Sequence, residues 1–204
     1  MKILFGLAAM AVLCAWFHAG PLWADTKTFT VSASVPLATS VNFTATNINA
    51  ATGNRTAVSG NSLSFDPMSF NSTSQAWFPD HFFAVDVAPS GPGNMNVTVN
   101  YTEGNNPNNP AHGLGWKSTA TFMKVTGTTE TALTAHGPKK MLKDLSGESI
   151  TTAEISGGFL RTYLGVVTKD QSAAFPDPPT SELFTNADKS GAYDGSLVIT
   201  ATVS

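Results

Sequence analysis

The chain has 204 residues and a formal net charge of −3, and only 12% of its residues are charged. This charged share is about half of that in typical globular proteins. Threonine, serine and asparagine supply 26, 19 and 14 residues, so neutral groups make most of the polar surface. The composition argues against nucleic-acid binding, which needs clustered cations. It also argues against intrinsic disorder, because 42% of the residues are apolar.

The N-terminus has the pattern of a secretory signal peptide. Lys2 is followed by an uncharged apolar stretch at 3–17, and Ala24 stands at a suitable cleavage position. The apolar run is shorter than the about 20 residues that span a bilayer. We therefore expect residues 1–24 to be removed during export. The chain has one cysteine, which lies in this segment, so the exported part would contain no disulfide.

Alternation of apolar and polar residues predicts β-strands along most of the remaining chain. The stretches with this pattern are 28–35, 41–45, 63–65, 82–87, 95–101, 120–122, 159–168 and 193–203. Turn-forming runs, such as Pro-Ser-Gly-Pro-Gly at 89–93, separate them. Short strands rich in β-branched residues favour an all-β fold, in this case an antiparallel sandwich.

The segments between the predicted strands are mostly loops. Residues 103–117 are rich in Asn, Pro and Gly, and residues 170–191 carry three prolines. Only 138–145 has a helical pattern, with two turns predicted over 139–145. No internal repeat or linker divides the exported chain, so we expect one domain.

No group of residues has the spacing of a catalytic or metal site. His81, His112 and His136 are isolated in the sequence, whereas zinc sites usually contain close pairs of ligands. The Gly-Leu-Gly-Trp-Lys run at 113–117 lacks the third glycine of a dinucleotide-binding loop and the spacing of a phosphate loop. No Gly-x-Ser-x-Gly elbow is present, and no pair of carboxylates stands out. We expect no enzymatic activity, no metal and no cofactor.

Aromatic residues provide an alternative function, a self-contained sandwich that binds carbohydrate. The candidates for a sugar-stacking surface are Trp77, Phe78, Phe82, Phe83 and Trp116. Large aromatic side chains also supply much of the buried area in small β-domains. We therefore expect two or three of the five to belong to the core, and the glycan-binding alternative depends on the others.

The two ends of the exported chain carry short motifs. Residues 29–35 read Phe-Thr-Val-Ser-Ala-Ser-Val, residues 63–67 read Leu-Ser-Phe-Asp-Pro, and residues 191–195 read Gly-Ala-Tyr-Asp-Gly before the last alternating stretch. In this order they resemble segments of the major pilins of the alpha class of the chaperone–usher pathway, the class typified by colonisation-factor fimbriae. The corresponding family segments are Ile-Thr-Val-Thr-Ala-Ser-Val, Leu-x-Tyr-x-Pro and Gly-x-Tyr-x-Gly. Residues 103–190 contain no motif that aligns with this family.

The resemblance implies an incomplete immunoglobulin-like β-sandwich that is completed by a donor strand from a neighbouring subunit. Residues 25–36 would be the donor extension and 37–204 the pilin domain. The donor side chains would be Phe29, Val31, Ala33 and Val35. The strand that lines the acceptor groove and pairs with the chaperone would contribute Leu197, Ile199, Ala201 and Val203.

The resemblance also implies the biological role. A pilin of this class is a structural subunit that polymerises head to tail into an adhesive surface fibre. Its partners would be identical subunits, a periplasmic chaperone and an outer-membrane usher, with a tip adhesin as a further candidate. The chain would pass through the periplasm to the cell surface and become part of a fimbrium. The choice between an abundant shaft subunit and a minor subunit stays open, as does a minor tip adhesin.

Overall fold

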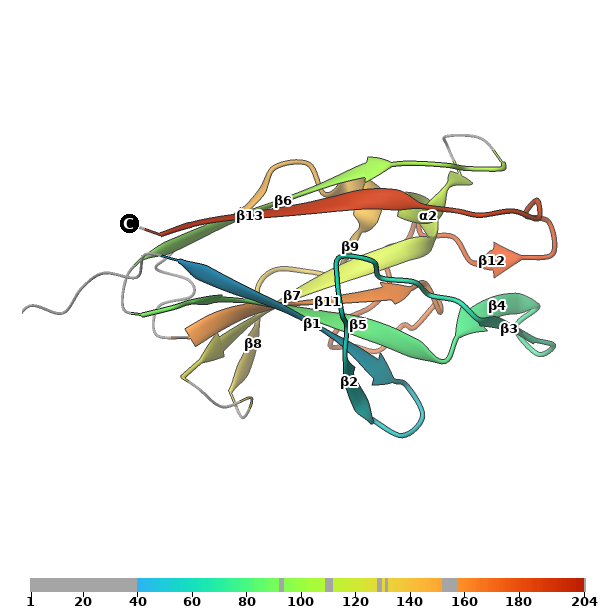
Figure 1. Ribbon diagram of the computed structural model, residues 1–204. Coiled ribbons are helices and arrows are strands. Elements are labelled where there is room, and N and C mark those ends of the chain that lie inside the picture. The colour runs from blue at the N-terminus through green and yellow to red at the C-terminus, as the bar shows by residue number, and fades with distance from the viewer. Residues whose placement is uncertain are drawn as a thin grey trace, which may run out of the picture. The chain divides into compact units, whose positions relative to one another are not determined.

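The computed structural model describes residues 40–91, 94–108, 112–127, 130, 132–151 and 158–203. All of them belong to one compact unit, residues 35–204. The described residues form predominantly antiparallel β-structure in three sheets, as Figure 1 shows. The predicted all-β class is therefore confirmed. The predicted signal peptide, at 1–24, and the predicted donor extension, at 25–36, lie outside the described residues.

The largest sheet has seven strands in the order β2-β1-β5-β11-β7-β8, with β9 also paired to β7. Every pairing in it is antiparallel. The strands are β1 (Val41–Asn49), β2 (Arg55–Ala57), β5 (His81–Pro89), β7 (Ser118–Thr126), β8 (Leu133–Ala135), β9 (Lys140–Met141) and β11 (Gly158–Val166).

A second sheet has three strands in the order β10-β6-β13. Its strands are β6 (Met95–Glu103), β10 (Glu148–Ile150) and β13 (Gly195–Val203). In Figure 1, β6 and β13 form one layer, and β1, β5, β11 and β7 form the other. A third, small sheet in the order β12-β4-β3 lies at one end of these layers. It contains β3 (Met68–Asn71), β4 (Ala76–Pro79) and β12 (Phe184–Thr185), and the helical turns are α2 (Leu114–Lys117) and the 3-10 turn η2 (Leu142–Asp144).

The hydrophobic core is built by the alternating residues of the two larger sheets. The inward side chains of β5, Phe83, Val85 and Val87, are all buried, as are Val97 and Val99 of β6. Complete burial of a large apolar side chain stabilises the fold by about 1.5–3 kcal/mol. Other fully buried side chains of this core are Phe122, Leu145, Ile150 and Leu160.

The predicted helix at 138–145 is wrong. Residues Lys140–Met141 pair with β7 as β9, and only the single 3-10 turn Leu142–Asp144 is helical. The apolar residues that suggested a helix, Met141, Leu142 and Leu145, are all buried. Their spacing therefore reflects contacts with the core that a short strand and a tight turn also make.

The predicted strand at 63–65 is also wrong. Residues 61–66 have no strand pairing, although Leu63 and Phe65 pack against the core. The Phe65 and Phe83 rings lie 5.3 Å apart between centroids, and His81 Nε2 lies 2.8 Å from the Ser64 carbonyl oxygen. Contacts of this kind give a loop the same alternation of buried and exposed residues that a strand has.

Candidate functional site

Two strands of the larger sheets have an edge without a strand partner among the described residues. β13 pairs with β6 along its whole length, and no described strand lies on its other side. β1 pairs with β5 along nine residues, but β2 covers only Thr46–Ile48 of its other edge. Next to that segment, Val58 N–H donates to the Ala45 carbonyl at 2.9 Å. At 41–44, the edge of β1 that faces away from β5 thus has no strand partner among the described residues.

Every second side chain of β13 from Leu197 to Val203 is partly buried, whereas Val198 between them is 51% exposed. Ile199 lies opposite Val99 and Ala201 lies opposite Val97 in the β6–β13 pairing. Both β6 residues are completely buried, whereas their β13 partners are only partly buried. The four residues predicted to line a groove share this face and this partial burial: Leu197, Ile199, Ala201 and Val203.

β1 shows the same incomplete burial on its core-facing side. Phe43 lies opposite Val87 of β5, so both side chains stand on the same face of the sheet. Val87 is completely buried, but 49% of Phe43 is exposed. Val41 and Ala45 pack against the core and are half-buried. The inward rows of β1 and β13 therefore border a region of the core that the described residues leave partly uncovered.

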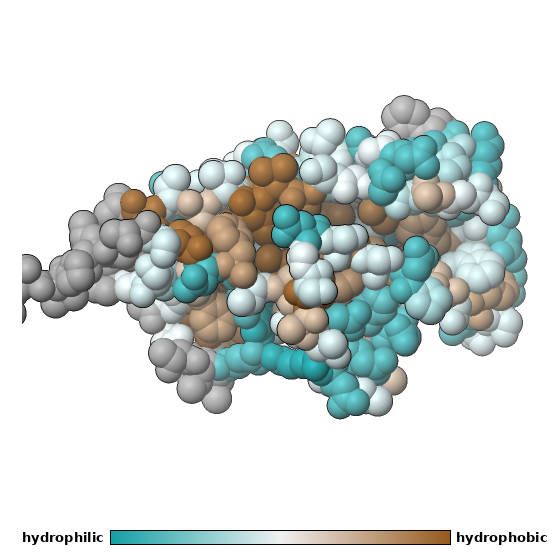
Figure 2. All heavy atoms as spheres, viewed as in Figure 1, coloured by the Kyte–Doolittle hydropathy of each residue, from teal (hydrophilic) through white to brown (hydrophobic). Residues whose placement is uncertain are grey.

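The exposed apolar surface between these two strands is visible in Figure 2, where brown residues gather over the region of β13 and β1. Neither strand contains a charged residue or a proline. Soluble proteins usually protect a free sheet edge with such residues, because an open edge can pair with another chain. We refer to the region between the inward rows of β1 and β13 as the groove.

A tyrosine marks one end of the groove. Tyr101 of β6 lies opposite Leu197, and its hydroxyl donates to Glu103 Oε1 at 3.2 Å. Burial raises the pKa of the Tyr101 phenol and the nearby Glu103 carboxylate raises it further, so the phenol stays neutral. A side chain at Gly195 would clash with the Tyr101 ring and hydroxyl. Glycine at the start of β13 therefore allows the tyrosine to lie close to the backbone.

The predicted donor side chains, Phe29, Val31, Ala33 and Val35, lie outside the described residues. The five predicted aromatic candidates are separated by the fold. Phe83 belongs to the core, and the ring of Phe82 packs against Tyr163 on the other face of the sheet. Trp77 is 37% exposed and lines a pocket beside the small sheet.

The three predicted isolated histidines also have separate surroundings. His81 is buried, with 7% of the residue exposed, and its Nδ1 lies 2.7 Å from Asp80 Oδ1. His112 Nδ1 lies 3.0 Å from Glu182 Oε2 near the surface. Within the described ranges, no group of three or more His, Cys, Asp or Glu side chains is placed to hold a metal ion.

The comparisons with known proteins assign no family. The chain matches no protein-family model, no curated protein and no solved structure. Over the residues that the structure describes, no helix has the length and apolar character of a membrane span.

Proposed function

We propose that this chain is a structural subunit of a surface fibre, and that its groove receives a strand from a second copy of the chain. The observation that carries the proposal is the pair of half-buried inward rows on β1 and β13. A strand placed between them would cover Phe43 and Ile199 and would pair with the open edge of β13. Strand addition of this kind obtains affinity from main-chain hydrogen bonds and specificity from alternate side chains.

The strand order supports an immunoglobulin-like sandwich that lacks one strand. That fold has strands A, B, E and D in one sheet and C, F and G in the other. Taken in chain order, β1, β5, β6, β7, β11 and β13 correspond to A to F, and the observed orders β1-β5-β11-β7 and β6-β13 match A-B-E-D and C-F. Strand G would pair with β13, on the edge that no described strand covers.

The proposed occupant of this position is the segment 28–35 of a second subunit. It is uncharged, like β1 and β13, and its apolar residues alternate as Phe29, Val31, Ala33 and Val35. Burial of Phe29, Val31 and Val35 would contribute about 1.5–3 kcal/mol each, and Ala33 would contribute less. Pro36 lacks the N–H that a strand pairing needs, so the added strand would end there.

Head-to-tail addition explains how one kind of subunit makes a fibre. The donor segment and the groove are different surfaces of the same chain, so each subunit can receive one neighbour and donate to another. Before assembly, a periplasmic chaperone would cover the groove by pairing with β13, and an outer-membrane usher would export the subunit to the cell surface. The proposal assigns no catalytic reaction to the chain.

The test compares residues 25–204, residues 37–204 and a synthetic peptide of residues 25–36. We expect 37–204 to unfold at low temperature alone and to be stabilised by the peptide. A matched peptide with Ala33→Asp should not stabilise it, because a charge would enter an apolar groove. The 25–204 chain should form multimers that resist dissociation on heating.

A different result would contradict the proposal. If 37–204 folds stably as a monomer and the peptide does not change its unfolding, the sandwich needs no donor strand. Multimers of 37–204 alone would also contradict it, because they would form without the donor segment.

A further inference from the structure

The small sheet β12-β4-β3 borders a pocket of about 700 Å³ near the start of β13. Segments 61–66 and 188–195 form much of its wall, together with Trp77 of β4. Its volume is within the range of about 300–1,000 Å³ that is typical of small-molecule sites. We propose that this pocket binds an uncharged carbohydrate, which stacks on Trp77 and donates a hydroxyl hydrogen bond to Asp66.

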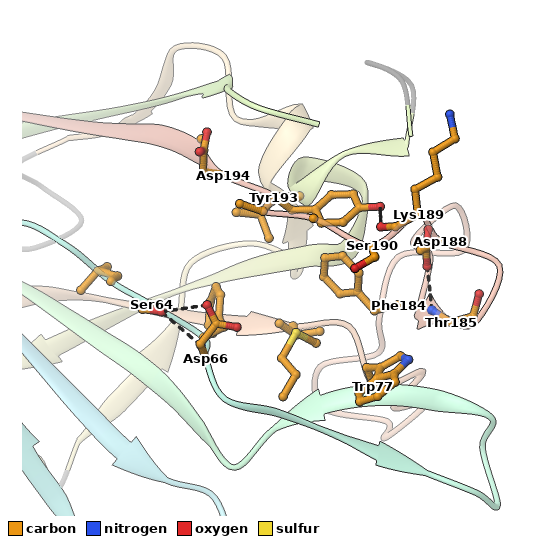
Figure 3. Close-up of a pocket in the computed structure, with 18 of the residues that line it drawn as sticks. Ser64, Asp66, Trp77, Phe184, Thr185, Asp188, Lys189, Ser190, Tyr193 and Asp194 are labelled. Carbon is orange, nitrogen blue, oxygen red and sulfur yellow. Dashed lines mark hydrogen bonds between the residues drawn. The ribbon is translucent and has the colours of Figure 1, made fainter. Parts of the chain in front are cut away.

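Aromatic rings form one side of the pocket. Trp77 lies opposite Phe70 in the β3–β4 pairing and opposite Phe184 in the β4–β12 pairing. The Phe184 and Tyr193 rings meet edge to face, with centroids 5.2 Å apart. Figure 3 shows the labelled rings of Trp77, Phe184 and Tyr193 along the same side of the pocket. The pairing of β4 with β12 therefore places Trp77 beside Phe184 on this side of the pocket.

Trp77 is both exposed and held in place. Although 37% of the residue is exposed, its indole N–H donates to Asn186 Oδ1 at 3.1 Å, and its ring lies 5.2 Å from that of Phe70. A ring that is already fixed loses little conformational entropy on binding. The face of an indole ring carries partial negative charge, which attracts the slightly positive C–H hydrogens on one face of a sugar ring.

Polar groups lie on the opposite side of the pocket. In Figure 3, Ser64 and Asp66 stand across the pocket from the aromatic rings. Within the described residues, the Asp66 carboxylate accepts only one long hydrogen bond from a side chain, from Ser64 Oγ at 3.4 Å. Asn186 uses its amide oxygen for Trp77 and so presents its NH₂ group as a donor. The Asp66 carboxylate would accept a hydrogen bond from one hydroxyl of a bound sugar ring, and the Asn186 NH₂ group would donate one to another hydroxyl.

The charges around the pocket favour an uncharged ligand. Asp66, Asp188 and Asp194 line it, against the single cation Lys189. Asp188 is already paired with the buried Lys117, at 2.9 Å from its Nζ. The remaining balance is negative, which disfavours acidic sugars such as sialic acid. The proposed ligand class is therefore a neutral hexose or N-acetylhexosamine.

The carbohydrate proposal does not depend on fibre formation. If the subunits do polymerise, each would bring one pocket to the fibre, and many weak contacts would then act together. A 25–204 chain that binds sugar but forms no multimers would refute the proposed function and leave this inference intact. A fibre that binds no sugar would refute the carbohydrate inference and leave the proposed function intact.

The test uses saturation-transfer NMR on the protein of residues 25–204. The probes are the methyl β-glycosides of glucose, galactose and N-acetylglucosamine, with the methyl glycoside of sialic acid as the acidic comparison. We expect the strongest transfer to the C–H protons on one face of a neutral ring. Trp77→Ala should reduce binding by about three- to tenfold, the loss of one aromatic contact.

Matched variants separate binding from folding. Trp77→Phe should retain part of the signal, and Asp66→Asn should weaken binding while the stacked protons stay the same. Leu133→Ala removes a similarly exposed apolar side chain on β8, which does not line the pocket, and should bind like the unchanged protein. The proposal is overturned if no neutral glycoside gives transfer, if the sialoside binds best, or if Trp77→Ala blocks subunit assembly without changing sugar binding.

Discussion

Phe43 of β1 lies directly opposite Val87 of β5, yet 49% of Phe43 is exposed and Val87 is completely buried. Two side chains on the same face of adjacent strands normally share one environment. The contrast arises because β5 lies between β1 and β11, while the stretch 41–44 of β1 has no described strand on the edge that faces away from β5. Ile199 and Val99 repeat the contrast in the other sheet.

The first prediction concerns Phe43. Phe43→Ala should weaken binding of the 25–36 peptide by about 2 kcal/mol, or about 30-fold, because the peptide would bury the exposed part of the ring. Val87→Ala removes a side chain that is already buried, so it should lower stability without a comparable loss of affinity. Fluorescence anisotropy of a labelled peptide measures both. Equal affinity for Phe43→Ala and the unchanged domain would place the peptide elsewhere.

The second prediction concerns the face of the donor segment. Ala33→Asp in residues 25–204 should abolish heat-resistant multimers, because the alternation places Ala33 on the buried side of the added strand. Ser32→Asp adds the same charge on the opposite side and should leave the multimers intact. Denaturing gel electrophoresis after incubation at increasing temperatures distinguishes the two. Equal loss of multimers in both variants would contradict the prediction, because it would show that the effect of the charge does not depend on which face of the donor segment carries it.

The third prediction concerns Arg161 of β11, which is buried opposite Asp86 of β5, with 4% of the residue exposed. Its Nε and Nη2 donate to the two Asp86 carboxylate oxygens at 2.7 Å, and Nη2 also donates to Glu130 Oε1 at 2.7 Å. Arg161→Met leaves Asp86 without its cation and should destabilise the domain by about 3–5 kcal/mol.

Arg161→Lys keeps the charge but loses the two-point contact, so a smaller loss of about 1–3 kcal/mol is expected. Urea unfolding of the peptide-bound domain measures both variants. A lysine variant as stable as the unchanged domain would refute a role for the guanidinium geometry. In either variant, the pKa of Glu130 should rise from about 2, because hydrogen bonds from Arg161 and Arg55 hold it low.

The fourth prediction concerns Asp188, the partner of the buried Lys117. Burial alone would raise the Asp188 pKa, but hydrogen bonds from Lys117, the Thr185 N–H and Asn108 lower it below 3.8. A carboxylate with a lowered folded pKa stabilises the fold above its unfolded pKa, and this contribution disappears as the pH falls through the folded pKa. Asp188→Asn should therefore destabilise the domain by about 3 kcal/mol at neutral pH.

The pH dependence gives this prediction a second readout. As the pH falls below about 4, the stability difference between Asp188→Asn and the unchanged protein should shrink, because the carboxylate takes up a proton in the unfolded chain before it does so in the native protein. The difference should be smallest below the folded pKa. Asp66→Asn changes an exposed carboxylate with a single long side-chain hydrogen bond and should alter stability by less than about 0.5 kcal/mol. Thermal unfolding from pH 2 to pH 7 measures both. A constant difference for Asp188→Asn would mean that its charge has no role in stability.

Local alternation was sufficient to locate the long strands. The predicted stretches 82–87, 95–101 and 193–203 correspond to β5, β6 and β13, because each strand buries one face and leaves a period of two in its sequence. The strands β3, β4 and β12 have only two to four residues, which is too short for a period to be recognised. They form through pairing between residues such as Trp77 and Phe184, which are far apart in the chain.

The order of apolar and polar residues was enough to predict the all-β class, the alternation at 28–35 and the row of β13 that carries Leu197, Ile199, Ala201 and Val203. The three-dimensional fold was needed to see that β13 and part of β1 have open edges among the described residues, and that Trp77 and Asp66 border one pocket. The physical reason is that alternation records which side of a strand is buried, whereas neighbours are selected by long-range pairing and packing.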